Sequence, residues 1–419
     1  MANEFCFERR NVIVVGGGAA GMMAAIHAAA MGAEVTMFEK NARLGRKLGI
    51  TGKGRCNVTN DCTTEEFMTN VPTNSKFLFA ALNRFSTRDT IDFFESCGVP
   101  LKTERGKRVF PQSDKAQDIV RALSDKCREY GVTVINEKVT SVKIENGTAK
   151  GVATDKGEYE GDAVIVCTGG MSYTGTGSDG DGYRFARRAG HTVTELLPSL
   201  VPIVCEGNLC QRMQGLSLKN VSMKIVRRDN ARVVFEDFGE MMFTHFGMTG
   251  PMVLSASAHI PDISSGNYEA HIDLKPALDE CQLDARIRSD FQKYNNRDFI
   301  NSLGDLLPLK IIEPIVQLSG IDARKKVNSV TREERTRLLQ VIKCLKIKLL
   351  RFRPIEEAII TKGGVCVNEI SPKTMQSKIV SDLYFAGEVL DLDAYTGGFN
   401  LQIAFSTAVL AGEAAAVDC

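Results

Sequence analysis

A single stretch near the start of the chain constrains the fold more than any other part. Residues 11–39 read NVIVVGGGAAGMMAAIHAAAMGAEVTMFE, and the apolar β-forming residues at its start predict a buried strand. Gly16, Gly18 and Gly21 follow at the spacing G-x-G-x-x-G, and the small residues from Ala24 onward predict a helix. A second apolar run ends in Glu39. This order of strand, glycine turn, helix, strand and acid predicts a βαβ unit.

Each glycine of this unit has its own physical task. Gly16 makes the tight turn, Gly18 lets the backbone approach a pyrophosphate, and Gly21 lets the helix pack closely on the strand. The free N–H groups at the helix start then face the phosphates. Glu39 stands where its carboxylate can accept hydrogen bonds from the adenosine ribose hydroxyls. An ordinary glycine-rich turn is the alternative, but the complete order of elements favours a dinucleotide site.

Composition limits the class of protein. The chain has 419 residues, enough for two or three domains, with 43% hydrophobic and 25% charged residues, as in an ordinary globular enzyme. The net charge of +1 provides no global field that favours nucleic acid or membrane. The apolar run from Val12 to Val35 contains too many glycines for a membrane helix. The N-terminus has no apolar signal core, and the 12 cysteines form no C-x-x-C pair. Free thiols in a reducing cytoplasm are therefore predicted.

A basic, glycine-rich loop follows Glu39. Residues 40–60 read KNARLGRKLGITGKGRCNVTN. Because this loop comes directly after the predicted ribose-binding acid, its cations can add to the attraction that the helix N-terminus exerts on a pyrophosphate. A solvated loop is the alternative. The cations are Arg43, Arg46, Lys47, Lys53 and Arg55.

The end of the chain contains a second strand–glycine–helix pattern. Leu383 to Ala386 predicts a strand that ends in Gly387 and Glu388, and the sequence GGFNLQ then opens a helix of small residues, Ala404 to Ala416. A carboxylate at such a strand end suits a ribityl or ribose hydroxyl, and the helix N-terminus can face the flavin pyrimidine edge. Residues 163–170, AVIVCTGG, predict another buried strand beside the first. Both ends of the chain would therefore build one FAD site, with the middle inserted.

The middle of the chain contains a part that predicts strands, followed by a part that predicts helices. Residues 193–274 contain strand-like runs that predict an antiparallel sheet or barrel, and residues 275–340 predict helices, one of which starts with a capping box of Thr331 and Glu334. Residues 345–352 alternate apolar and basic side chains, as an edge or barrel strand would. From 321 to 353 there are 11 Lys or Arg and 3 Asp or Glu, a local charge of 11 − 3 = +8. This segment is either a solvated face or a docking surface for an anionic partner, including RNA.

Four longer blocks carry a resemblance to a known family. They are VGGGAAGMMAA, LGRKLGITGKGRCNVTN, FTHFGMTGP and LYFAGEVLDLDAYTGGFNLQIAFSTAVLAG. Together they resemble the BaiN/RdsA family of FAD-dependent oxidoreductases over essentially the whole chain. The resemblance implies an α/β Rossmann-like FAD-binding domain from 1–192 and 354–419. It also implies an inserted antiparallel β-barrel-like domain at 193–274 and 345–353, and a small helical domain at 275–344.

The resemblance also implies non-covalent FAD and a set of contacts to it. No metal site is predicted. The positions that would contact the cofactor are Gly16, Gly18, Ala19, Ala20, Gly21, Glu39, Lys40, Arg46, Lys47, Gly52, Cys56, Asn57, Val139, Thr168, Gly169, Gly387, Glu388, Asn400 and Leu401.

The family implies three activities. One branch resembles clostridial bile-acid enzymes that reduce ring double bonds of 3-oxo-Δ4 and Δ4,6 intermediates, and another resembles enzymes that reduce a uridine of 23S ribosomal RNA to dihydrouridine. An aminoacetone or amine oxidase activity is a third implication, and a non-catalytic flavin-binding protein remains a further alternative. The leading hypothesis is reduction of an activated, enone-type C=C bond of a small-molecule substrate. Gly16, Gly18 and Gly21 form the one G-x-G-x-x-G that directly follows a predicted strand, and no second Rossmann insert for NAD(P)H is predicted. NAD(P)H would therefore visit the flavin transiently, or another reductant would serve.

Enone reduction also needs an acid that protonates the carbon next to the one that receives hydride. Cys56 is one candidate, because nearby cations such as Lys53 and Arg55 would stabilise its thiolate and lower its pKa. Simple packing of Cys56 against the flavin is the alternative. Tyr173, His245 and Tyr395 are rival donors, each on a glycine-bearing stretch. The sequence leaves the oligomeric state open.

Overall fold

The computed structural model of the protein describes residues 9–417. The chain divides into two compact units. The first unit contains residues up to Pro198 and from Ala358 onward, so both ends of the chain belong to it. The second unit is the single segment Ser199–Glu357. The sequence places the corresponding breaks at 192/193 and 353/354.

A five-stranded parallel sheet forms the centre of the first unit. Its strands lie in the order β19–β10–β1–β2–β6. The central strand β1 is paired in parallel with β2 on one side and with β10 on the other, with Val14 opposite Met37 and Ile165. The short, almost fully apolar strands suit a sheet that is covered on both faces. The strand bounds are β1 (Asn11–Val15), β2 (Glu34–Phe38), β6 (Thr133–Ile135), β10 (Ala163–Val166) and β19 (Leu383–Phe385).

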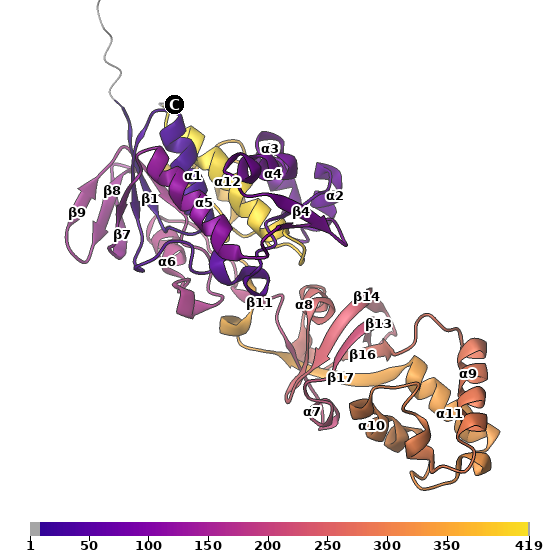
Figure 1. Ribbon diagram of the computed structural model, residues 1–419. Coiled ribbons are helices and arrows are strands. Elements are labelled where there is room, and N and C mark those ends of the chain that lie inside the picture. The colour runs from indigo at the N-terminus through magenta and orange to yellow at the C-terminus, as the bar shows by residue number, and fades with distance from the viewer. Residues whose placement is uncertain (1–8, 418–419) are drawn as a thin grey trace, which may run out of the picture. The chain divides into compact units, whose positions relative to one another are not determined.

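Two helices from opposite ends of the chain pack against each other in this unit. They are α1 (Ala19–Ala30) and α12 (Phe399–Ala415), and they lie side by side in Figure 1. A Cβ at Gly412 would lie 2.4 Å from the Ala24 carbonyl oxygen, so this close approach requires a glycine in α12. Helix α1 begins at Ala19, five residues before the run of small residues that predicts it, whereas α12 begins within the GGFNLQ segment that is expected to open it. The prediction of a Rossmann-like fold is confirmed.

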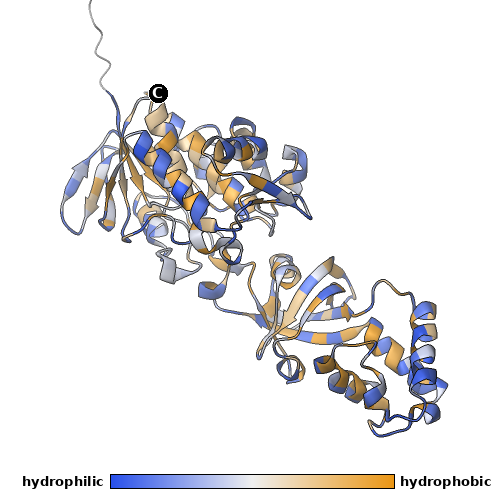
Figure 2. Ribbon diagram, viewed as in Figure 1, coloured by the Kyte–Doolittle hydropathy of each residue, from blue (hydrophilic) through white to orange (hydrophobic). Residues whose placement is uncertain are grey.

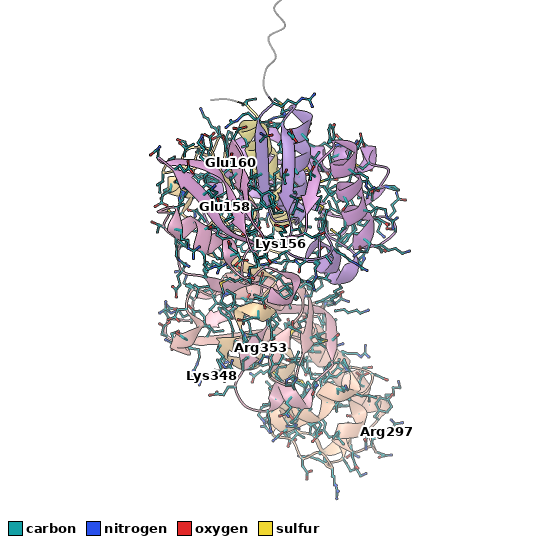
Figure 3. The ribbon with its side chains drawn as sticks, turned by 90° about the vertical axis from the view of Figure 1, so that its left-hand side faces the viewer. Lys156, Glu158, Glu160, Arg297, Lys348 and Arg353 are labelled. Carbon is teal, nitrogen blue, oxygen red and sulfur yellow. The ribbon has the colours of Figure 1, made fainter. Side chains whose placement is uncertain are left out.

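The rest of the first unit surrounds this sheet. A three-stranded antiparallel sheet of β7, β8 and β9 ends in the edge strand β9, whose Glu158 and Glu160 are labelled in Figure 3. Charged side chains on an edge strand oppose pairing with another chain. The first unit's other strands include β3 (Thr59–Asn60), β4 (Leu101–Glu104), β5 (Arg108–Pro111), β7 (Val139–Glu145), β8 (Thr148–Thr154) and β9 (Glu158–Glu160). Its other α-helices are α2 (Thr64–Thr69), α3 (Phe79–Arg84), α4 (Thr87–Ser96), α5 (Ala116–Glu129) and α6 (Asp181–Arg188). Its short 3-10 helices include η1 (Leu48–Gly54), η2 (Ser75–Leu78), η3 (Thr174–Thr176) and η8 (Val367–Glu369).

The second unit is built on a closed barrel of six strands. The strands follow the order β12–β15–β14–β13–β16–β17 and are mutually antiparallel. Buried and less buried residues alternate along β16, as expected of a strand with one face toward a core. The predicted barrel is therefore confirmed, and β17 has the bounds that the sequence predicts. The bounds are β12 (Ile203–Cys205), β13 (Ser217–Arg227), β14 (Val233–Phe243), β15 (Gly247–Thr249), β16 (Tyr268–Asp273) and β17 (Leu345–Phe352).

Three α-helices between β16 and β17 belong to the second unit, which also contains α7 (Leu209–Arg212) and α8 (Pro251–Ala258). The three helices are α9 (Glu280–Lys293), α10 (Leu309–Ser319) and α11 (Arg332–Lys343). In Figure 2, α9 is mainly hydrophilic and α10 mainly hydrophobic in colour. The predicted capping box at the start of α11 is confirmed, since Thr331 and Glu334 bond reciprocally. Leu283 of α9 and Ile311 of α10 belong to the same hydrophobic cluster as the barrel interior, so barrel and helices share one core.

Candidate functional site

The turn between β1 and α1 has the geometry that close backbone approach requires. A Cβ at Gly21 would lie 1.7 Å from the Gly16 carbonyl oxygen, and a Cβ at Gly16 would lie 2.6 Å from the Cys167 oxygen. These two glycines are therefore required by packing within the protein. A Cβ at Gly18 would meet no atom of the described chain within 4 Å. Because Gly18 precedes Ala19 and Ala20 at the N-terminus of α1, the protein leaves its backbone open to an anionic ligand.

Glu39 is held rigidly beside this turn. Its carboxylate accepts hydrogen bonds from the Gly17 N–H at 2.9 Å, from the Asn41 N–H at 2.8 Å and from the Asn41 side-chain amide at 2.6 Å. The residue is only 8% exposed. An ionised carboxylate has about four lone-pair positions, so capacity remains for ribose hydroxyls. The position after β2 and this fixed orientation suit recognition of an adenosine ribose.

The end of β10 contains a buried hydroxyl with an unsatisfied hydrogen-bonding capacity. The Thr168 Oγ1 atom has no hydrogen-bond partner within residues 9–417. A Cβ at Gly182 would lie 2.1 Å from this oxygen, so α6 packs directly against it. An unpaired buried hydroxyl costs about 1–3 kcal/mol, and such a group in a native structure requires an explanation. A polar group of a bound cofactor would supply the missing partner. Thr168 and the adjacent Gly169 were both predicted cofactor contacts.

Lys47 and Glu388 join the two ends of the chain. The Lys47 ammonium lies 2.6 Å from one Glu388 oxygen and donates to Ser172 Oγ at 2.7 Å. The other Glu388 oxygen accepts from Ser172 Oγ at 2.9 Å and from the Thr361 N–H at 2.9 Å. This network fixes the carboxylate that follows Gly387 at the end of β19. It places a predicted contact of the basic loop beside a predicted contact of the C-terminal strand.

Lys40 bridges to the glycine-rich loop that follows β10. Its ammonium lies 2.7 Å from Asp179 and 3.0 Å from Asp181. Asn41 extends the same bridge, because its side-chain amide donates to the Thr176 oxygen at 3.3 Å and its side-chain oxygen accepts from Arg46 at 2.6 Å. The loop after β2 and the loop after β10 are thereby held together at one edge of the sheet.

The prediction of a thiolate at Cys56 is wrong. Cys56 is completely buried, and this burial raises the pKa of its thiol to about 12. Arg55 does not offset the effect, because its guanidinium pairs with Glu104 at 2.5 Å and with Asp114 at 2.6 Å. Burial in a low-dielectric surrounding disfavours the charged form of a thiol when no cation faces it. Cys56 is therefore a protonated, packed side chain.

Two other predicted cofactor contacts, Asn57 and Asn400, make hydrogen bonds that fix the loops next to the start of α12. The Asn57 amide donates to the Thr59 and Val109 carbonyls at 3.0 and 3.1 Å and accepts from the Gly398 N–H at 3.0 Å. The Asn400 amide accepts from the Ala394 N–H at 3.0 Å and donates to its oxygen at 2.8 Å. Gly52, Val139 and Leu401 have no polar side-chain group, and their roles as cofactor contacts stay predictions.

The three rival proton donors lie in different surroundings. Tyr395 follows Asp393 in the loop before α12; burial, with Asp393 as a second cause, raises the pKa of its phenol. Tyr173 is exposed and has a left-handed backbone at φ +51°. His245 belongs to the second unit, where its ring meets Phe246 edge to face. Tyr173 and Tyr395 therefore belong to the first unit, and the roles of all three residues as proton donors stay predictions.

Sequence reasoning missed three residues that fix the site. Ser172 and Thr361 hold Glu388, and Asn41 holds Glu39. Ser172 follows the Thr-Gly-Gly turn and Asn41 lies two residues after Glu39, so their places in the sequence, close to predicted site residues, could have indicated both. Nothing in the sequence around Thr361 indicates a role in the site, because only the fold brings it to Glu388.

These residues fit FAD: an open helix N-terminus for the pyrophosphate, a fixed acid for the adenosine ribose, and an unpaired hydroxyl at the strand end. A family model described as the HI0933-like protein Rossmann domain matches residues 10–414. The chain belongs to the HI0933-like family. The predicted resemblance is confirmed, and the fold is the Rossmann-type FAD-binding fold of this oxidoreductase family.

Two proteins of known name match almost the whole chain. One is the 3-dehydro-bile acid Δ(4,6)-reductase of Clostridium scindens, which is 30% identical over 96% of this chain and 98% of its own. The other is the ribosomal RNA dihydrouridine synthase of Escherichia coli, which is 31% identical over 96% of each chain.

Solved structures share the fold at low identity. A 3-ketosteroid-Δ4-(5α)-dehydrogenase from Rhodococcus jostii matches 100% of this chain and 99% of its own, with a TM-score of 0.55 and 15% identity. A 3-ketosteroid Δ1-dehydrogenase from Sterolibacterium denitrificans gives a TM-score of 0.54 at 14% identity, over 97% of this chain and 99% of its own. No helix between residues 9 and 417 has the length and hydropathy needed to cross a membrane.

Proposed function

We propose that this protein is an FAD-dependent reductase of activated C=C bonds in small molecules, with NAD(P)H as the hydride donor. The observation that carries the proposal is the full-length similarity to two relatives whose named reactions share one chemistry. A Δ(4,6)-reductase and a dihydrouridine synthase both add hydrogen to a C=C bond conjugated with a carbonyl group. The common reaction type is therefore better supported than either substrate.

Different residues of the first unit would hold different parts of the cofactor. The N-terminus of α1 and Gly18 would receive the pyrophosphate, and Glu39 the adenosine ribose. Glu388, fixed by Lys47, would hold a hydroxyl of the ribityl chain. Bound FAD would supply the hydride-transfer chemistry that connects a nicotinamide with the β-carbon of an enone. Tyr395 is a candidate proton donor from the same unit, because a tyrosine phenol is protonated at neutral pH and burial raises its pKa further.

An enone on a steroid acid is the substrate class that we favour. The Clostridium scindens relative is named for a bile-acid intermediate of this type. The proposed substrate is accordingly a 3-oxo-Δ4 or 3-oxo-Δ4,6 bile-acid intermediate.

Ribosomal RNA is the second candidate substrate, favoured by the Escherichia coli relative and by the basic segment 321–353. Acids outside that segment pair with several of its cations. Lys325 pairs with Glu334 within it, whereas Lys343 pairs with Asp273 at 2.6 Å and Lys348 with Glu206 at 2.8 Å. Lys348 and Arg353 are labelled in Figure 3. Paired cations release fewer counterions on binding RNA, so the local charge of +8 overstates the attraction.

The experiment is anaerobic reoxidation of the reduced holoprotein, monitored by flavin absorbance. The protein is first reduced with NADH or NADPH, and the oxidants are 4-androstene-3,17-dione, a 3-oxo-Δ4 bile acid and a uridine-containing 23S rRNA fragment. We expect the enones to restore the oxidised spectrum and to be recovered as reduced products. Reoxidation by the rRNA fragment alone would move the assignment to the second candidate.

The basic segment offers a control for that second outcome. Lys346 and Arg351 are exposed cations of β17, so the double variant K346E/R351E removes charge without removing a buried partner. If RNA is the substrate, this variant should weaken RNA binding and flatten its salt dependence while leaving enone turnover unchanged. If neither enone nor RNA reoxidises the flavin, the proposed reductase function is wrong.

A further inference from the structure

Two exposed apolar side chains flank the hydrogen-bond network of Lys47, Ser172 and Glu388. Tyr173 directly follows Ser172, and the Ile359 carbonyl oxygen lies 3.2 Å from the Ser172 hydroxyl. Tyr173 is 37% and Ile359 is 36% exposed, although both side chains are large. Exposed apolar residues that are scattered singly are common, but two of them beside a candidate cofactor site are placed to contact a ligand.

The two segments that carry these side chains are bonded to each other. The Met171 N–H donates to Thr361 Oγ1 at 2.8 Å, and Thr361 lies two residues after Ile359. The Thr361 N–H in turn donates to the Glu388 carboxylate at 2.9 Å. The backbones at Tyr173 and Ile359 are therefore fixed next to the carboxylate that we assign to the ribityl chain, and less conformational entropy is lost when a ligand binds to them.

Tyr173 has a backbone conformation that its side chain disfavours. Its φ of +51° and ψ of +51° lie in the left-handed region, which aromatic residues rarely adopt. Glycine, which the same loop contains at positions 175 and 177, would adopt these angles without strain. Across residues 9–417 the Tyr173 ring stacks on no other ring or cation, and its hydroxyl has no hydrogen-bond partner. An aromatic residue that is held in this conformation without a polar or aromatic partner in its own chain indicates a contact with a ligand.

The chemistry of this surface suits a hydrocarbon ring system. Tyr173 provides an aromatic ring and Ile359 a branched aliphatic chain, and both lose contact with water when an apolar ligand lies against them. The charges beside them are already paired, because the Lys47 ammonium lies 2.6 Å from the Glu388 carboxylate. The surface therefore provides no unpaired charge from this network for an ionic ligand, and a polycyclic hydrocarbon gains more from it than a polyanion does.

We propose that Tyr173 and Ile359 determine substrate specificity by holding the apolar ring system of a polycyclic enone beside Glu388. This inference rests on the proposed reductase function, because it names the surface on which the substrate of that reaction would lie. The role depends on the ring of Tyr173 and not on its hydroxyl, so it differs from the role of a proton donor.

The test compares a polycyclic enone with a small one. Binding of 4-androstene-3,17-dione to the oxidised holoprotein is measured from the change in flavin absorbance, and 2-cyclohexen-1-one is used to reoxidise the photochemically reduced holoprotein. The variant Y173N/I359S removes both apolar side chains, and asparagine tolerates the left-handed backbone. Y173F keeps the ring and removes only the hydroxyl. Y130S/I379S is the matched control, because Tyr130 and Ile379 are exposed residues of the first unit that lie outside the proposed surface.

We expect Y173N/I359S to weaken binding of the steroid by about tenfold or more, and to change FAD affinity and the rate of reoxidation by cyclohexenone by less than about twofold. Y173F and Y130S/I379S should bind the steroid as the unaltered protein does.

Three results would overturn the proposal: no steroid binding by the unaltered protein, equal steroid binding by Y173N/I359S, or a loss in Y173F as large as in Y173N/I359S. A fall in FAD affinity in Y173N/I359S would also overturn it, because the two side chains would then contact the cofactor. Reoxidation of the unaltered protein by cyclohexenone reports on the reductase function separately. Its absence would contradict that function, whereas the steroid-binding data decide the role of Tyr173 and Ile359.

Discussion

The Lys47 ammonium lies 2.6 Å from the Glu388 carboxylate, although the two residues are 341 positions apart in the chain. Their side chains are about one-fifth exposed, and Ser172 bonds to both. This ion pair connects the basic loop after β2 with the last strand of the sheet. It is a direct physical link between the two ends of the chain at the candidate cofactor site.

The first prediction concerns the energy of this pair. In a double-mutant cycle with K47M and E388Q, the coupling free energy should be about 1–3 kcal/mol, because the partners share a hydrogen-bond network and are largely shielded from water. Urea unfolding of the single and double variants measures it. The exposed pair Arg88–Asp92 on α4 is the control, with an expected coupling below about 0.5 kcal/mol. Equal couplings would contradict the structural role given to Lys47 and Glu388.

The second prediction separates two glycines of one motif. Gly18→Ala adds a Cβ that meets no protein atom, so the thermal midpoint of the FAD-free protein should be unchanged while FAD affinity falls by about tenfold or more. Gly21→Ala places a Cβ 1.7 Å from the Gly16 oxygen and should destabilise the FAD-free protein itself. Calorimetry of both variants measures the thermal midpoint of the FAD-free protein, and titration with FAD measures its affinity for the cofactor. Loss of stability in G18A would show that Gly18 is required by packing.

The sequence predicted the parts of this site that depend on local pattern. Gly16, Gly18, Gly21 and Glu39 follow a spacing in which each residue has a local physical task. Strand β17 was predicted with its observed bounds, since alternation of apolar and basic residues is a strong signal.

Long-range contacts were beyond the reach of that reasoning. The pairing of Arg55 with Glu104 and Asp114 is set by the fold, so the cation beside Cys56 in the sequence does not act on its thiol. In the same way, the acids that pair with Lys343 and Lys348 come from outside the basic segment. Net charge counted along a segment omits such partners.

The third prediction concerns Cys56. Because burial raises the pKa of its thiol to about 12, Cys56 should resist iodoacetamide in the native protein at mildly alkaline pH. The exposed Cys281 should be alkylated readily and provides the internal control. Peptide mass spectrometry after timed alkylation gives both rates. Labelling of Cys56 as fast as Cys281 would restore the thiolate hypothesis.

The fourth prediction concerns acid stability. The ring of His191 is buried between Glu369 at 3.1 Å and Ser377 at 2.8 Å and meets Phe385 edge to face. Burial lowers its pKa from the ordinary value of 6.5, so the unfolded chain binds this proton more readily than the folded chain. The stabilisation is therefore complete above 6.5 and is lost as the pH falls toward the lowered folded value.

The variant H191Q should consequently show a weaker loss of unfolding free energy on acidification below 6.5. It should also be less stable at neutral pH by about 1–3 kcal/mol, since it loses hydrogen bonds to buried partners. Burial lowers the pKa of His27 and His259 as well, so some pH dependence will remain. H245Q, at an exposed site, is the control. An unchanged pH profile in H191Q would contradict the assignment.

The identity of the flavin tests the central claim most directly, namely that the two ends of the chain build one non-covalent FAD site. Purified protein, reconstituted if necessary, is denatured, and the released flavin is identified by chromatography and counted against protein. We predict one FAD per chain, released completely, because Glu39 and the N-terminus of α1 are placed for the adenosine half of the cofactor. Release of FMN, or absence of any flavin after reconstitution, would contradict the account.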